Sequence, residues 1–81
     1  MDATAVMYGE VVHVPVGDVS DYEEGILSAS ARLAEFVHAP IHRDRDDAGQ
    51  NEWYVCGCHG DVSLGGNIMQ MTVAFARAGH E

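Results

Sequence analysis

The sequence contains no lysine, and its few positive charges come from arginines: Arg32, Arg43, Arg45 and Arg77. Thirteen acidic residues outnumber these four, so the formal net charge is −9. A small chain with this balance repels nucleic-acid phosphates, which excludes direct binding of DNA or RNA. The same field attracts basic protein surfaces, so we expect a basic protein partner. The alternative is that the acidic surface serves solubility alone.

Long apolar runs are missing as well. Gly, Ser or charged residues interrupt every hydrophobic stretch well before the ~20 residues that a membrane-spanning helix needs. No basic stretch precedes an apolar run at residues 1–4, so we expect no signal peptide. These absences predict a cytoplasmic protein without membrane association.

The chain also lacks repeats, linkers and low-complexity tracts, and we expect residues 1–81 to form a single domain. A hydrophobic fraction of 47% is ample for a folded core. A chain this short buries only about 60% of the surface that its unfolded form exposes, so its stability is marginal. A metal or a second copy is the usual reinforcement at this size.

The first half of the chain predicts a strand and then a helix. Residues 4–16 are rich in Val and Tyr, and Gly9 marks either a bulge or a tight turn that splits this strand. Ser20 is the expected N-cap, with Glu23 three residues later as in a capping box. Apolar residues then recur at helical spacing, and Pro40 ends the helix near residues 38–39.

The second half predicts a hairpin and a second helix. Residues 40–45 are an extended segment, residues 46–50 a turn and residues 52–58 a strand, which together form a hairpin if the first segment is a strand. Apolar residues spaced three and four apart predict a helix over 64–78. The expected fold is therefore a small α+β domain of the order βαββα, with two helices on one face of a mainly antiparallel sheet.

The predicted second helix is apolar on several sides, so it needs cover from more than one direction. In a chain this small a second subunit can supply that cover, and we expect a homodimer or other homo-oligomer. The predicted dimer interface consists of Met69, Met71, Val73 and Phe75.

Residues 56–59 read Cys-Gly-Cys-His, which supplies ligands that zinc prefers. Cys56, Cys58 and His59 are therefore a candidate metal site, with His38 and His42 as further ligands. Structural zinc sites usually place two residues between cysteines, so the spacing departs from the common pattern. Thiol redox chemistry or a Cys–His nucleophile are alternatives, as is a structural role for both cysteines without any cofactor.

Arg43 and Arg45 hold half of the positive charge, and Trp53 and Tyr54 lie near them in sequence. Arg, Trp and Tyr are enriched at interface hot spots, so these four residues are the predicted partner-binding site. No catalytic residues are predicted, since no constellation stands out. The sequence favours a binding or regulatory protein of the inhibitor, immunity or modulator type that acts as a homodimer on a basic protein. The alternative is a small thiol- or zinc-dependent protein centred on Cys56, Cys58 and His59.

Overall fold

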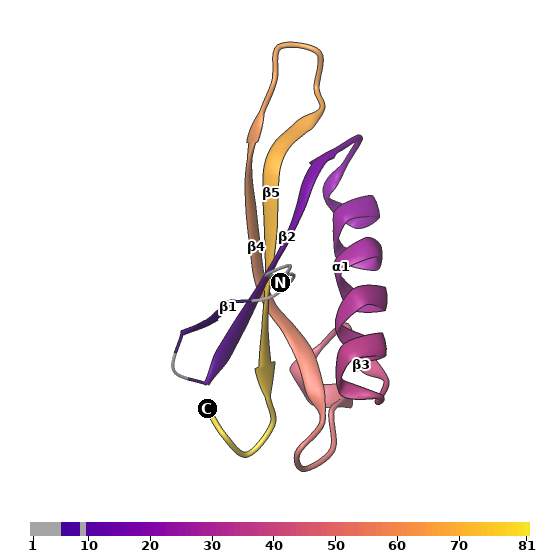
Figure 1. The fold of residues 1–81 in the computed structure, drawn as a ribbon, viewed down its shortest axis with the longest axis vertical. Coiled ribbons are helices and arrows are strands. Elements are labelled where there is room, and N and C mark those ends of the chain that lie inside the picture. The colour runs from indigo at the N-terminus through magenta and orange to yellow at the C-terminus, as the bar shows by residue number, and fades with distance from the viewer. Residues whose placement is uncertain (1–5, 9) are drawn as a thin grey trace.

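One α-helix packs against a mixed β-sheet in the computed structural model, which describes residues 6–8 and 10–81. The elements are β1 (Val6–Tyr8), β2 (Val11–Val19), α1 (Tyr22–Val37), β3 (Ile41–His42), the 3-10 helix η1 (Arg45–Asp47), β4 (Trp53–Val62) and β5 (Ile68–Arg77). The strand order is β1-β2-β5-β4-β3. Figure 1 shows α1 lying along one face of the sheet and the β4–β5 turn extending beyond the end of the helix. The predicted α+β class is confirmed.

The first predicted helix is confirmed as α1, with its cap one residue later than expected. The Asp21 carboxylate, rather than the Ser20 hydroxyl, accepts the backbone N–H of Glu24 at 2.8 Å. The Glu24 carboxylate in turn accepts the backbone N–H of Ser20 at 3.0 Å, one residue before the N-cap N–H that a capping box uses. At the other end His38 adopts a left-handed conformation (φ 56°), and the helix ends before Pro40.

The predicted N-terminal strand is two strands. β1 pairs antiparallel with β2, with Val6 opposite His13 and Tyr8 opposite Val11. Of the bulge and the tight turn that the sequence predicts at Gly9, this arrangement corresponds to the turn that splits the strand. Gly9 itself and residues 4 and 5 lie outside the described residues.

The predicted hairpin between residues 40–45 and 52–58 is wrong. β3 is a strand, but it pairs in parallel with β4, with Ile41 opposite Trp53 and His42 opposite Tyr54. The intervening chain forms η1 and a turn and so re-enters the sheet in the same direction rather than folding straight back. The sheet is therefore mixed, because its other three pairings are antiparallel.

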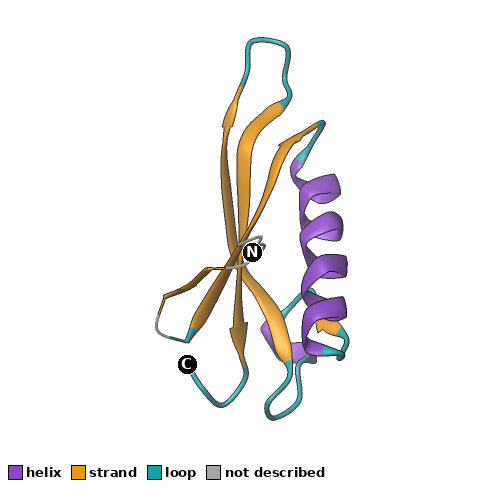
Figure 2. Ribbon diagram, viewed as in Figure 1, coloured by secondary structure: helices purple, strands orange, loops and turns teal. Residues whose placement is uncertain are grey.

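The predicted second helix is also wrong, since residues 68–77 form the central strand β5 (Figure 2). Met71, Val73 and Phe75 are fully buried at every second position, which is the period of a strand. Gln70 lies in the left-handed region (φ 53°), where the ladder with β4 and β2 is irregular. This irregularity turns Ile68 onto the same face as Met71 and produces the three-residue spacing that resembled a helix.

The core lies between α1 and the sheet. Ala29 and Leu33 of the helix pack with Val14, Val73 and Phe75, all of which are at most 2% exposed. The remaining members of this buried cluster are Val12, Ile26, Ile68 and Met71. Truncating a side chain such as Phe75 to Ala would cost about 3–5 kcal/mol. No helix in the described part of the chain is long and apolar enough to cross a membrane.

Candidate acidic binding site

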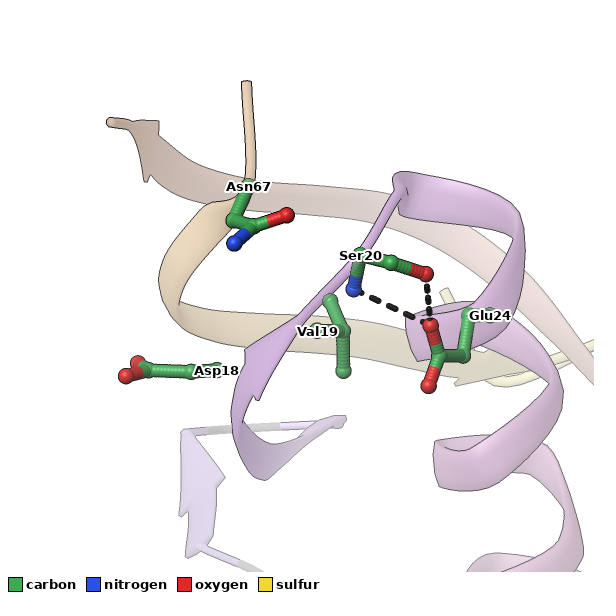
Figure 3. Close-up of a pocket in the computed structure, with 5 residues that line it drawn as sticks. All are labelled: Asp18, Val19, Ser20, Glu24 and Asn67. Carbon is green, nitrogen blue, oxygen red and sulfur yellow. Dashed lines mark hydrogen bonds between the residues drawn. The ribbon is translucent and has the colours of Figure 1, made fainter. Parts of the chain in front are cut away.

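A small pocket lies where β2 ends, α1 begins and β5 starts (Figure 3). Val19 pairs with Ile68, and this pairing brings Asn67 beside the end of β2 although the two segments are far apart in sequence. The cavity measures about 220 Å³. Its lining residues are Asp18, Val19, Ser20, Glu24 and Asn67.

Two carboxylates give the pocket its chemistry. One oxygen of Asp18 accepts the backbone N–H of Gln70 at 3.0 Å, and one oxygen of Glu24 accepts both the backbone N–H and the hydroxyl of Ser20. The second oxygen of each carboxylate makes no hydrogen bond to the described residues. Figure 3 shows Glu24 turned toward Ser20 and the Asp18 carboxylate extending away from it.

These groups can act as hydrogen-bond acceptors for a cationic donor. An ionised carboxylate accepts strongly from ammonium and guanidinium groups, and the Asn67 amide adds an uncharged partner. Sequence reasoning assigned the acidic residues near the start of the helix to capping and missed the pocket. The proximity of Asp18 to Asn67 depends on strand pairing between β2 and β5, for which the sequence carries no local signal.

The predicted partner-binding residues are distributed over several internal contacts. Arg43 donates to the Glu23 carboxylate at 2.7 Å, and Arg45 donates to the Glu81 carboxylate at 2.6 Å. Tyr54 is buried and donates its hydroxyl to Glu81, and this hydrogen bond, together with the loss of hydration on burial, raises the pKa of Tyr54. Trp53 is half-buried, with the Arg77 guanidinium 5.6 Å from the centre of its ring. The four side chains therefore do not form one open surface.

The predicted dimer interface is mostly core. Met71, Val73 and Phe75 are 0% exposed within the chain itself, so they contact no partner while this fold persists. They are buried because β5 is the central strand and alternate residues face α1. Met69 is 42% exposed and is the one residue of the predicted interface that is open to solvent.

The predicted metal ligands lie on β4 and are exposed, but a bulge separates them. The ladder with β5 shifts between Val55 and Gly57, so Cys56 is an extra residue in the strand, and Cys58 lies opposite Val73 while His59 lies opposite Thr72. Both cysteines are free and count as exposed residues. The Cys56 thiol still loses some of its hydration to neighbouring atoms, and this desolvation raises its pKa. Within the described residues, no group of three or more His, Cys, Asp or Glu side chains is arranged to hold a metal ion.

The further predicted ligands also lie elsewhere. His42 faces Glu52, with 3.1 Å between its Nε2 and a carboxylate oxygen, and His38 is at the exposed end of α1. Within the described part of a single chain, the predicted zinc ligands therefore do not form a complete coordination site.

Comparison with known proteins does not assign this chain to a group: no protein-family model, curated protein or solved structure matches it.

Proposed function

We propose that this protein is an acidic protein-binding module that acts as a homodimer and takes a basic side chain of its partner into the pocket formed by Asp18, Val19, Ser20, Glu24 and Asn67. The partner contributes a Lys or Arg side chain from an exposed basic segment. The ammonium or guanidinium group donates to Asp18 and Glu24, which line the same cavity.

The main support for this proposal is that all four arginines make contacts outside the pocket. Arg43 and Arg45 are paired with Glu23 and Glu81. Arg32 donates to the Pro15 carbonyl oxygen at 2.6 Å, and Arg77 lies over Trp53. With no lysine in the chain, the pocket carboxylates have no cationic partner among the described residues. An external cation therefore meets two acceptors that are already held in position.

The test is a calorimetric titration of the protein with an oligolysine peptide. Replacing Asp18→Asn and Glu24→Gln together keeps the size and most hydrogen bonds of the pocket but removes both charges. We expect this double variant to bind the peptide at least ~10-fold more weakly than the unaltered protein, because two charge-assisted hydrogen bonds are lost.

A matched control separates the pocket from the general acidic field. Glu35→Gln with Asp44→Asn removes the same charge from exposed positions outside the pocket. A control that loses as much affinity as the pocket variant would show that only net charge matters, and absence of any binding would overturn the proposal.

The exposure of both thiols favours one alternative, a thiol- or zinc-dependent protein centred on Cys56, Cys58 and His59. Because a single chain offers no complete ligand set within its described part, zinc would need ligands from a second copy. A native mass spectrum with one zinc per two chains, lost in the Cys56→Ser, Cys58→Ser variant, would favour this alternative over the acidic module.

A further inference from the structure

A row of residues crosses three strands at the end of the sheet where α1 begins. Val19 of β2 lies opposite Ile68 of β5, and Ile68 lies opposite Val62 of β4. Residues opposite one another in a sheet point to the same face, and Ile68 and Val19 belong to the core that packs against α1. Val62 therefore points to the helix side as well. Val19 also lines the acidic pocket, so the row leads from the pocket to β4.

The β4 end of this row is apolar and uncovered. Figure 1 shows the β4–β5 turn extending past the start of α1. Val62 at the end of β4 is accordingly 62% exposed, whereas Ile68, the next residue along the row, is 3% exposed. Leu64 in the turn is fully exposed, and Tyr22 at the start of α1 donates its hydroxyl to the Gly60 carbonyl oxygen at 3.2 Å. We call Tyr22, Val62, Leu64 and Ile68 the apolar shelf.

Charged groups are kept off the apolar shelf. No charged residue occurs in the segment 62–69, in a chain of net charge −9. The preceding Asp61 lies opposite Met69 and points to the other face of the sheet, because successive side chains in a strand alternate. Glu23 at the start of α1 is paired with Arg43. Carboxylates and apolar side chains therefore occupy opposite ends of one row.

Hydrogen bonds hold the turn that carries Leu64. The Ser63 backbone N–H donates to the Asn67 carbonyl oxygen at 2.7 Å, and the Asn67 N–H donates to the Ser63 hydroxyl oxygen at 3.2 Å. The Gly66 N–H donates to the Ser63 carbonyl oxygen at 2.9 Å. Asn67 also lines the pocket, so the same turn positions the shelf and one wall of the pocket. A surface that is held in place before binding loses less entropy when a partner docks.

We propose that the apolar shelf binds a large apolar side chain from the same partner segment whose Lys or Arg enters the acidic pocket. This inference rests on the proposed function and specifies its partner as a protein segment that is both basic and apolar. Charge complementarity selects this occupant, because a chain of net charge −9 attracts a basic segment and repels an anionic membrane surface. The shared row places both contacts within reach of one segment.

The geometry of the row sets the spacing within the partner segment. The row crosses two strand spacings of ~4.8 Å, so Val19 and Val62 lie about 10 Å apart. Three residues of an extended chain cover the same length at ~3.3 Å per residue. We therefore expect a large apolar residue three positions from the basic residue.

Two peptides of equal length and charge test the shelf. Three repeats of Lys-Lys-Ser-Leu place a Leu three positions after a Lys, and three repeats of Lys-Lys-Ser-Ser are the matched control. Burial of a Leu side chain is worth about 10- to 100-fold in affinity. Calorimetry should therefore show that the unaltered protein binds the leucine peptide at least ~10-fold more tightly than the serine peptide.

Variants of the protein locate this leucine advantage. Val62→Thr with Leu64→Ser should reduce it to less than ~3-fold, because both exposed apolar side chains of the sheet end are lost. The affinity for the serine peptide should not change, which also shows that the variant is folded. Phe36→Gln removes a comparably exposed apolar side chain from the last turn of α1 and should retain the full advantage.

Each outcome bears on a different part of the proposal. A leucine advantage that is absent from the unaltered protein, or that persists in the Val62→Thr, Leu64→Ser variant, would overturn the shelf and leave the pocket standing. Undiminished binding of the serine peptide by the Asp18→Asn, Glu24→Gln variant would instead overturn the proposed function. Sedimentation with neutral phosphatidylcholine vesicles distinguishes a lipid contact. Vesicle binding that depends on Val62 and Leu64, in place of a leucine advantage, would assign the shelf to lipid and overturn the protein partner.

Discussion

The Glu81 carboxylate links the end of the chain to two distant segments. It accepts hydrogen bonds from the Arg45 guanidinium at 2.6 Å, from the Tyr54 hydroxyl and from the Gly79 backbone N–H at 3.0 Å. These donors favour the ionised form, with Arg45 having the largest effect, and lower the pKa of Glu81 from 4.5 to about 2. A carboxylate with a lowered pKa stabilises the folded state above its unfolded pKa, and this stabilisation disappears as the pH falls through the folded value.

We predict that Glu81→Gln lowers the thermal unfolding midpoint at pH 7, and that the difference from the unaltered protein shrinks between pH 4.5 and about 2. Calorimetric scans across this pH range measure the difference directly. Glu35→Gln is the control, since Glu35 is exposed on α1 and should leave the midpoint nearly unchanged at every pH. A Glu81→Gln difference that persists unchanged at pH 2 would contradict the ion-pair explanation.

The contacts of individual residues are the part of the site that could not be predicted from the sequence. Arg43 and Arg45 were identified as the notable cations, but their partners Glu23 and Glu81 lie 20 and 36 residues away. The same long separation hid the pocket, where Asp18 meets Asn67 through strand pairing. Composition indicated an acidic binding surface, whereas the position of its carboxylates depends on tertiary structure.

At the scale of secondary structure, the irregularity at Gln70 controls how β5 fits the sheet. Its backbone lies at φ 53°, and its N–H donates to Asp18 rather than continuing the regular ladder. A side chain in this region is strained, and a β-branched one more so. We predict that Gln70→Val lowers the free energy of unfolding by about 1–2 kcal/mol, whereas Gln70→Gly changes it by less than about 1 kcal/mol.

Urea unfolding measures both effects, and Cys58→Val is the control because Cys58 is exposed in a regularly paired part of β4. A Val at position 70 that is tolerated as well as Gly would show that the left-handed backbone there carries no strain.

The same irregularity explains why the sequence predicted one helix correctly and the other wrongly. In α1 the cap, the apolar stripe and Pro40 all agree, and every signal is local. In β5 the bulge interrupts the alternation between Ile68 and Met71, so the apolar spacing fits a helix and a bulged strand equally well. The sequence carries no local signal for the parallel pairing of β3 with β4 either. This pairing consists of two contacts between distant residues, Ile41 with Trp53 and His42 with Tyr54.

At the scale of the whole molecule, the net charge of −9 acts in opposite directions on the two proposed associations. Attraction between the acidic pocket and a basic partner is electrostatic, and salt weakens it. Two copies of this chain repel each other because both carry the same net charge, so salt removes an obstacle to the proposed homodimer and strengthens it.

We therefore predict that raising NaCl from about 0.05 M to about 1 M, which shortens the screening length from roughly 14 Å to roughly 3 Å, weakens oligolysine binding and tightens the dimer. Calorimetry and sedimentation equilibrium on the same preparations measure the two dissociation constants. If both associations weaken together, charge pairs hold the two copies together, and the prediction fails. If oligolysine binding weakens while the dimer tightens, two different surfaces carry the two associations: the carboxylates at the end of β2 bind the basic partner, and repulsion between equal net charges is what limits the association of two copies.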